Sequence, residues 1–263
     1  MSANAFFKDR VVLVTGAASG IGLAIADRFA AEGSIVISVD IDEMKGKAAV
    51  EALRKQGGRG EFVLADVSDE EDVARAVGVA AAKWNGIDHL VNNAGIVLVK
   101  SIEECTVEEW DRVMAVNVRS IFLTAKHALP WLKRSPSPTI VNIGSVSSFV
   151  GQANTPAYVA SKGAVAMLSK AMALDFSGFG IRVNCVCPGI TDTPMLRHHI
   201  STSADPDKTV RERVNRVPLG RMLTGDDIAS ATLFLSGNES AGITGTTLLV
   251  DAGYLAAAEW SNP

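Results

Sequence analysis

Short apolar runs alternate with longer amphipathic stretches along most of the chain. The short runs are rich in Val, Ile and Leu, whereas the longer ones repeat apolar residues every three or four positions, as helices do. This alternation is typical of parallel strands with helices on both faces of the sheet. The expected strands span residues 11–15, 34–39, 61–65, 87–91, 139–144, 181–186 and 246–251. The expected helices span residues 23–30, 43–56, 69–84, 106–115, 120–133, 157–176 and 225–235.

No linker-like or low-complexity break and no internal repeat divides the 263 residues. An α/β fold of this length commonly forms one domain. We therefore expect one catalytic domain over residues 1–263, an α/β fold with a doubly wound parallel sheet of about seven strands and helices on both faces.

A glycine-rich segment follows the first expected strand at once. Gly16, Gly20 and Gly22 have the spacing Gly-x-x-x-Gly-x-Gly, and the helical pattern begins directly after them. Glycine lets the backbone turn tightly and approach a pyrophosphate, whose charge the helix N-terminus stabilises. A strand, a glycine loop and a helix in this order predict a Rossmann-like nucleotide-binding site.

Asp40 ends the second expected strand, where a carboxylate about 20 residues after the first glycine hydrogen-bonds the adenosine ribose of NAD. The same carboxylate would repel the 2′-phosphate of NADP, and the adjacent Ile41 offers no cation to offset that repulsion. The alternative role, a helix N-cap, fits Asp42 better. The sequence therefore predicts NAD as the cofactor.

Tyr158 and Lys162 lie four residues apart in a helical stretch that contains one Gly and no Pro. Residues four apart share a helix face, so a phenol would lie beside an ammonium. A free phenol ionises only at about pH 10, and a nearby cation favours the phenolate. The pair could serve as an acid/base group, although most such pairs are a packed ring and a solvated amine.

Three further polar positions lie where the pattern predicts strand ends or helix junctions. Ser145 follows the run 139–144, at the edge where open α/β sheets bind ligands. The segment 92–95, Asn-Asn-Ala-Gly, follows the fourth expected strand and either forms a plain turn or lines the cofactor cleft. Asn117 lies between two expected helices, where a buried amide is unfavourable unless it is hydrogen-bonded.

Composition argues against several other classes of protein. Hydrophobic residues make up 48% of the chain and charged residues 21%, which favours a large core over disorder. The net charge of −4 gives no electrostatic reason to expect nucleic acid as a partner. Residues 1–8 lack the pattern of a secretory signal, and no uncharged apolar run reaches the roughly 18 residues that a membrane span needs.

The three cysteines show no Cys-x-x-Cys repeat. Cys185 and Cys187 alternate in a strand-like run and would face the same side, which favours core packing over a metal site or a disulfide. We expect no metal site and a reducing, cytoplasmic location.

Residues 195–216 are polar and look irregular, with Ala204-Asp205-Pro206-Asp207 interrupting any helix. A segment of this kind near the carboxyl end of a strand is a candidate substrate lid. His198 and His199 either contact the substrate from this lid or are simply solvated.

The motifs together resemble those of the classical short-chain dehydrogenase/reductases. Thr15-Gly16-x-x-x-Gly20-x-Gly22, Asn92 to Gly95, Asn117, Ser145, Tyr158-x-x-x-Lys162 and Pro188-Gly189 occur in that family's order and spacing. The resemblance covers residues 9–253, and no catalytic position is replaced. Any one motif is weak, but the ordered set is highly specific.

The resemblance implies a role for each matching position. Tyr158 would be the general acid/base, Lys162 would support it and bind the nicotinamide ribose, Ser145 would orient the substrate oxygen, and Asn117 would hold a relay water. Substrate contacts would come from Ser145, Tyr158, Ser147 and Gln152. The implied cofactor-binding residues are Gly16, Ser19, Gly20, Ile21, Gly22, Asp40, Ile41, Asp66, Val67, Asn93, Ala94, Gly95, Tyr158, Lys162, Pro188, Gly189, Thr191 and Thr193.

The expected function is therefore NAD-dependent hydride transfer between a secondary alcohol or ketone and nicotinamide. The substrate would be a small polyol, sugar or cyclic alcohol, and the family's habit favours a homotetramer. The alternatives are a 3-oxoacyl-carrier-protein reductase, which would use NADPH and a basic docking surface, and a nucleotide-sugar epimerase. A non-enzymatic nucleotide sensor on the same fold is the third, since fold does not fix function.

Overall fold

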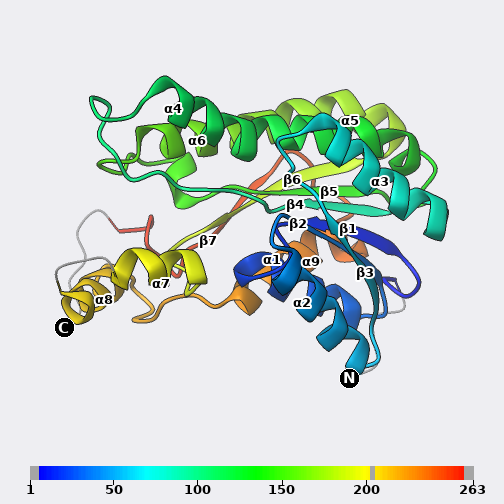
Figure 1. Cartoon of the computed structure of the whole chain (residues 1–263), viewed down its shortest axis with the longest axis horizontal. Helices are drawn as coiled ribbons and strands as arrows, with labels where there is room; N and C mark the ends of the chain where they lie inside the picture. The colour runs from blue at the N-terminus through cyan, green and yellow to red at the C-terminus, as the bar shows by residue number, and fades with distance from the viewer. Residues whose placement is uncertain (1–5, 202–204, 258–263) are drawn as a thin grey trace.

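The computed structural model describes residues 6–201 and 205–257 (Figure 1). They form a seven-stranded sheet in the order β3-β2-β1-β4-β5-β6-β7, and every neighbouring pair is parallel. The expected doubly wound α/β fold is confirmed. The strands are β1 (Val11–Thr15), β2 (Ile35–Asp40), β3 (Arg59–Leu64), β4 (His89–Asn92), β5 (Thr139–Ile143), β6 (Arg182–Pro188) and β7 (Thr247–Val250).

Helices cover both faces of the sheet, with α3 to α6 above it and α1, α2 and α9 below it in Figure 1. Two short helices, α7 and α8, follow the carboxyl end of β6 and lie at the lower left. None of the described helices is both long and apolar enough to cross a bilayer. The helices are α1 (Gly20–Ala31), α2 (Glu43–Lys55), α3 (Glu70–Trp84), α4 (Val107–Met114), α5 (Ser120–Leu132), α6 (Pro156–Phe176), α7 (Pro194–Ser201), α8 (Pro206–Val214) and α9 (Gly225–Ser236), with shorter turns η1 (Ala115–Arg119), η2 (Val146–Ser148), η3 (Ser177–Phe179) and η4 (Asn238–Ser240).

Strand β1 shows why the strands are apolar throughout. Successive side chains of a strand point to opposite faces of the sheet. Val11 and Leu13 pack in the cluster that includes α3, α5 and α6, whereas Val12 and Val14 pack with Phe29 of α1 and with α9. Both faces are therefore buried, as is usual for parallel sheets.

Polar side chains set the start of several helices. Asp42 accepts the backbone N–H of Lys45 at the start of α2, which confirms it as the N-cap there. Thr106 and Glu109 form a reciprocal capping box at the start of α4.

The segment 195–216 differs from the sequence prediction. It is not irregular, because α7 and α8 occupy most of it, and residues 202–204 lie outside the described part of the chain. Pro206 begins α8 instead of breaking a helix, since proline is favoured in the first helical turn. Asp205 caps the same helix by accepting the N–H of Lys208.

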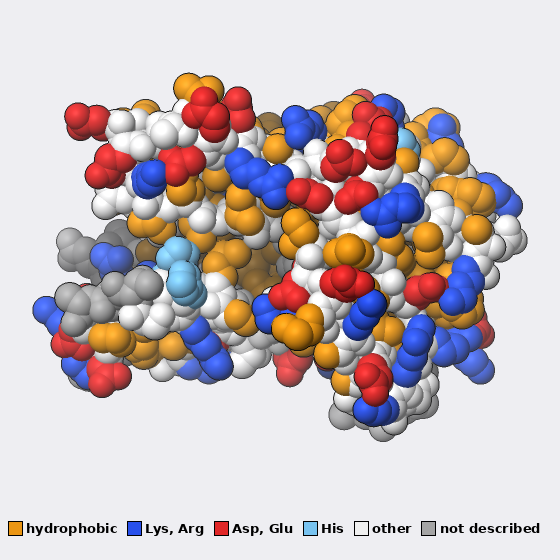
Figure 2. Space-filling model, in the orientation of Figure 1, with side chains coloured by type: hydrophobic (Ala, Val, Ile, Leu, Met, Phe, Trp, Pro, Cys, Tyr) orange, Lys and Arg blue, Asp and Glu red, His pale blue; other side chains and the backbone are white. Residues whose placement is uncertain are grey.

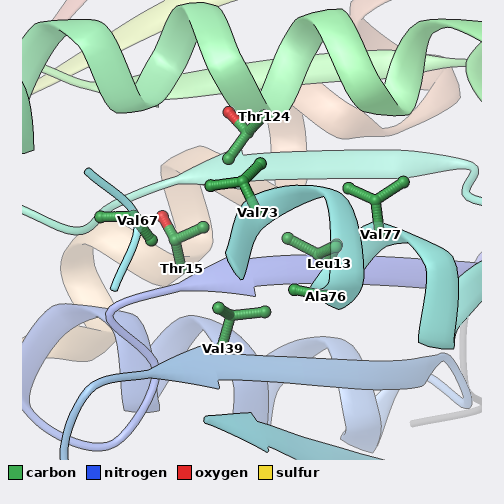
Figure 3. Close-up of a pocket in the computed structure, with 8 residues that line it drawn as sticks. All are labelled: Leu13, Thr15, Val39, Val67, Val73, Ala76, Val77 and Thr124. Atoms are coloured by element: carbon green, nitrogen blue, oxygen red, sulfur yellow. The ribbon is translucent and has the colours of Figure 1, made fainter. Parts of the chain in front are cut away.

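A small cavity of about 10 Å³ lies on the α3 face of the sheet (Figure 3). Its lining residues are Leu13, Thr15, Val39, Val67, Val73, Ala76, Val77 and Thr124. Both threonine hydroxyls already have partners, Val91 O for Thr15 and Asn92 Oδ1 for Thr124. The cavity is therefore a packing gap in the core and not a binding site.

Candidate active site

Ser145, Tyr158 and Lys162 meet at the carboxyl end of β5. Ser145 follows this strand after a single glycine, and its buried Oγ accepts the backbone N–H of Ser147 at 3.1 Å. Tyr158 lies in the first turn of α6, and Lys162 Nζ is 5.8 Å from the centre of its ring, so the two side chains share a face. Lys162 is 5% exposed and donates to Ile143 O at 2.8 Å. This bond fixes the ammonium between α6 and the end of β5.

Asn117 lies in η1, a π-helical turn that joins α4 to α5 without a break. Its Nδ2 donates to Ile96 O and to Ser161 Oγ, both at 2.9 Å, and its Oδ1 accepts the N–H of Ile96 at 2.8 Å. A Cβ added at Gly95 would lie 3.3 Å from Asn117 Oδ1 and 3.6 Å from Lys162 Nζ. Both amide hydrogens of Asn117 are used, so this group has none left to donate to a relay water.

The glycine loop is held in a shape that only glycine fits. Gly16 and Gly20 have positive φ angles of 65° and 57°. A Cβ at Gly22 would lie 2.0 Å from Gly16 O. Asn93 locks the loop by donating from Nδ2 to Thr15 O at 3.0 Å and to Gly16 O at 3.1 Å.

The N-terminus of α1 is available to an anion. Ser19 is its N-cap and makes no side-chain capping bond, and Ile21 follows in the first turn. The first backbone N–H groups of the helix can therefore bind a phosphate group. A Cβ at Gly20 would lie 3.5 Å from Pro194 and 3.6 Å from Thr193, so α7 begins directly against this loop.

Asp40 ends β2 and contacts the glycine loop. Its Oδ2 accepts the N–H of Ala18 at 2.9 Å, and its Oδ1 accepts the N–H of Asp42 at 3.0 Å. A carboxylate oxygen has two acceptor sites, so each can still bind a ribose hydroxyl. Ile41 beside it is 62% exposed and offers an apolar surface for a base.

Asp66 and Val67 follow β3 and differ in which of their groups could contact an adenine base. The carboxylate of Asp66 accepts from Ser68 N at 2.9 Å, Ser68 Oγ at 2.7 Å and Arg112 Nη2 at 3.1 Å. Partial burial acts to raise the pKa of Asp66, but these contacts outweigh it and hold the pKa below its usual value. The side chain of Val67 lies in the core beside the cavity of Figure 3, which leaves only its backbone for a base.

The segment after β6 lies beside the glycine loop, since Thr193 and Pro194 are close to Gly20. A Cβ at Gly189 would lie 2.7 Å from Asp251 Cα, so the chain passes too closely for another residue after Pro188. Thr191 is buried and donates to Gly189 O at 3.1 Å. Thr193 Oγ1 accepts the N–H of Leu196 at 3.2 Å and helps to start α7.

The sequence-predicted substrate residues line up next to Ser145. Ser147 is buried, and its Oγ donates to Gln152 Oε1 at 3.4 Å. Figure 2 shows a hollow between α7 and the layer of α4 and α6, with histidine side chains over α7 at its rim. His198 and His199 are the histidines of α7, with ring centres 5.9 Å apart.

Another hollow, of about 350 Å³, lies away from these residues, at the amino ends of β5 and β6. Arg182, Ser137 and Asn238 are among its lining residues. It is on the opposite edge of the sheet from Ser145, and its lining includes neither Ser145, Tyr158 nor Lys162.

Comparison with known proteins decides the family. Residues 16–255 match the family model described as enoyl-(acyl carrier protein) reductase. Cyclopentanol dehydrogenase from Comamonas testosteroni is 39% identical over 248 residues, which cover 94% of this chain and 98% of the relative. The chain belongs to the short-chain dehydrogenase/reductase family.

Other members of the short-chain dehydrogenase/reductase family align with almost the whole chain. Cis-4-hydroxycyclohexanecarboxylate dehydrogenase from Sinomonas cyclohexanicum is 39% identical over 251 residues, 95% of this chain and 98% of the relative. The ligand-free structure of aldohexose dehydrogenase from Thermoplasma acidophilum is 37% identical, covers 98% of both chains and superposes with a TM-score of 0.89.

Sequence reasoning missed several side chains that shape this short-chain dehydrogenase/reductase site. Ser161 links Asn117 to the backbone O of Tyr158, to which its hydroxyl donates at 2.7 Å. Arg112 and Arg119 reach across to the turn of Asp66. Serine in a helix and arginine on a helix surface have no local signal of this kind, because their partners are far away in sequence.

Proposed function

We propose that this protein oxidises a secondary alcohol to a ketone with NAD⁺, with Tyr158 as the general acid/base. The observation that carries the proposal is the buried Lys162 ammonium beside the Tyr158 ring, at the end of β5 where Ser145 lies. An ammonium in this place can stabilise the negative charge that the phenol oxygen carries while a proton moves between it and an alcohol.

Each side chain then has a defined task. The Ser145 hydroxyl donates to the substrate oxygen and holds it near the phenol. Tyr158 takes the alcohol proton, and Lys162 keeps the negative charge on the phenol oxygen favourable. A nicotinamide cofactor held by the glycine loop and Asp40 would supply the acceptor for the hydride of the carbinol carbon. Gly95, at the border between Asn117 and Lys162, leaves room that a side chain would fill.

The proposed cofactor is NAD, not NADP. The glycine loop at residues 16–22 suits a dinucleotide. Gly22 leaves the backbone no room for a side chain, and the N-terminus of α1 has no side-chain cap, so its N–H groups can bind a phosphate. Asp40 supports the choice of NAD, since its carboxylate can accept from ribose hydroxyls and would repel a 2′-phosphate. The exposed Ile41 suits the face of the adenine.

The proposed substrate is a small cyclic or other secondary alcohol. Two relatives are named for a cyclopentanol and for a hydroxycyclohexanecarboxylate, and a structural relative is named for aldohexoses. Val97 and Leu98 would supply apolar contacts, and Ser147 and Gln152 polar ones. The segment 195–216, with its helices α7 and α8, would close over this substrate.

The main alternative is a reductase of carrier-bound acyl chains, which the description of the family model names. Such an enzyme would need a basic surface for an acidic carrier, and the net charge of this chain is −4. A nucleotide sensor without activity would retain cofactor binding alone.

We also propose a cytoplasmic homo-oligomer, with a tetramer favoured. Three large apolar side chains on α5 and α6 are exposed in the single chain: Phe122 by 53%, Met167 by 63% and Leu174 by 78%. Covering them would bury apolar surface. Sedimentation velocity should give a mass above that of one chain.

A panel of cyclic and acyclic secondary alcohols, each with NAD⁺ and with NADP⁺, tests the function. The proposal predicts NADH formation with at least one alcohol, and the matching ketone as product. Activity only with NADPH and a 3-oxoacyl thioester would favour the reductase. Cofactor binding without any turnover would favour the sensor.

A further inference from the structure

Two arginines hold the turn that carries Asp66. Arg112, on α4, donates from Nη1 to Ser68 Oγ at 2.7 Å and from Nη2 to Asp66 Oδ2 at 3.1 Å. Arg119, the last residue of η1, donates to the backbone carbonyl of Ser68 at 3.0 Å. Asn117 lies between them in the chain. The segment that carries Asn117 is thus bound at two points to the turn at residues 66–68.

The contacts leave the Asp66 carboxylate nearly saturated. An ionised carboxylate has about four acceptor sites. Three are used, by Ser68 N, Ser68 Oγ and Arg112. About one site therefore remains for a donor such as the exocyclic amine of adenine. The Asp66 side chain is 30% exposed and that of Arg112 49%, so the ion pair is partly screened by solvent.

We infer that Arg112 is a positioning residue for the adenine half of the cofactor. The guanidinium fork contacts Asp66 and Ser68 together and so fixes the rotation of the carboxylate and the direction of its free acceptor. Arg119 holds the same turn by its backbone. This role rests on the proposed function, because it requires an adenine nucleotide in the cleft.

A second ion pair serves as a control, because it also links two parts of the chain but does not contact Asp66. Lys126 on α5 pairs with Glu70 on α3 at 2.7 Å, with similar exposure and no contact with Asp66. Both pairs join the α4–α5 segment to the stretch between the end of β3 and the first residue of α3. Only Arg112 contacts a residue of the proposed cofactor site.

The test is calorimetric binding of two overlapping fragments of NAD⁺, ADP-ribose, which contains adenine, and nicotinamide mononucleotide, which does not. For Arg112→Gln we expect about five- to tenfold weaker binding of ADP-ribose and unchanged binding of nicotinamide mononucleotide. KM for NAD⁺ should rise by a similar factor while kcat stays unchanged. Arg112→Lys keeps the charge but not the paired contacts, so its affinity for ADP-ribose should fall by less than that of Arg112→Gln. Lys126→Gln should bind both ligands as the unmutated protein does.

Three results would overturn the inference. They are unchanged ADP-ribose binding in Arg112→Gln, equal weakening of both ligands, and the same loss in Lys126→Gln. If Arg112→Gln does not fold, Ser68→Ala removes the shared hydroxyl and keeps the arginine, and unchanged ADP-ribose binding there would overturn it. Failure of the unmutated protein to bind ADP-ribose would overturn the proposed function as well, which distinguishes the two claims.

Discussion

At the scale of single residues, Asp40 combines a structural task with a proposed choice of cofactor. Its carboxylate bonds Ala18 N and Asp42 N. We expect kcat/KM to be at least tenfold higher with NAD⁺ than with NADP⁺, a difference of about 1.4 kcal/mol. Asp40→Asn keeps an acceptor oxygen for the loop but removes the charge, so it should narrow that ratio. Equal kcat/KM for both cofactors in the unmutated protein would contradict this assignment.

Lys162 should affect both catalysis and cofactor binding. Lys162→Met removes the cation beside Tyr158 and the bond to Ile143 O, so we expect turnover to fall by about tenfold or more and NAD⁺ to bind less tightly. Lys170→Met is the matched control, since Lys170 lies two turns further along α6 and is exposed. Steady-state kinetics and calorimetry measure both effects. Normal turnover and binding in Lys162→Met would show that the ammonium is not needed.

The site residues that the sequence predicts share a local signal. Tyr158 and Lys162 are one helical turn apart, and Gly16, Gly20 and Gly22 directly follow a strand. Arg112 gave no such signal, because its partners Asp66 and Ser68 are more than 40 positions away in the chain. Its proposed role follows only from the contacts of its side chain with the turn at residues 66–68.

At the scale of elements, the proposed lid should be the least protected part of the fold. Helix α8 has no buried residue, and in α7 only Ile200 is buried. We expect amides of residues 194–201 and 205–214 to exchange faster than those of α6 in the free protein, and more slowly with cofactor and substrate. Hydrogen exchange measured by mass spectrometry checks this. Strong protection in the free protein would show a fixed element and not a gate.

The two helices of this segment and the π-helical turn could not be predicted from sequence pattern. The sequence pattern predicts an interruption at Pro206, but a proline is equally suited to begin a helix, and the Asp205 cap decides between the two. The turn 115–119 has ordinary helical composition. Asn117 within this turn contacts Ile96 and Ser161, which tertiary structure alone brings together.

At the scale of the whole molecule, one buried histidine should make stability depend on pH. His89 is fully buried at the start of β4, with Nδ1 2.7 Å from Thr139 Oγ1. Burial is the main cause that lowers the pKa of His89 to about 4, with Asp88 acting against it. The groups around the ring are Phe6, Phe7, Phe29, Thr139, Asp88, Arg10 and Arg182.

Because unfolded histidine titrates near 6.5, the unfolded chain binds more protons than the folded one between that pH and about 4. We expect the free energy of unfolding to fall through this window as pH decreases, with His89 contributing roughly 3 kcal/mol at most. Denaturant titrations of His89→Phe should show a shallower pH dependence of the free energy of unfolding. His127→Gln, at a half-buried position of α5 beside Glu70, should change that dependence less. An equally steep dependence in His89→Phe would assign the effect to other groups.

The overall architecture was predictable because burial on both faces leaves a strong pattern. Apolar strands such as Val11–Thr15 alternate with amphipathic helices. This alternation predicts parallel strands, because consecutive parallel strands need a helical crossover between them. The order of the strands in the sheet, such as β1 between β2 and β4, leaves no comparable signal in a single sequence. The proximity of Ser145, Tyr158 and Lys162 was predictable as well, since Ser145 follows the end of β5 and the other two lie one helical turn apart; their roles stay a prediction.

The most direct test of the account compares NADH formation by the unmutated protein and by Tyr158→Phe, with the same secondary alcohol. Phenylalanine keeps the ring beside Lys162 but removes the oxygen that accepts the proton. We predict that kcat/KM falls by roughly 10²-fold or more while the melting temperature and the binding of NAD⁺ stay unchanged. Near-normal turnover by Tyr158→Phe would show that the proton goes elsewhere and would contradict the central claim.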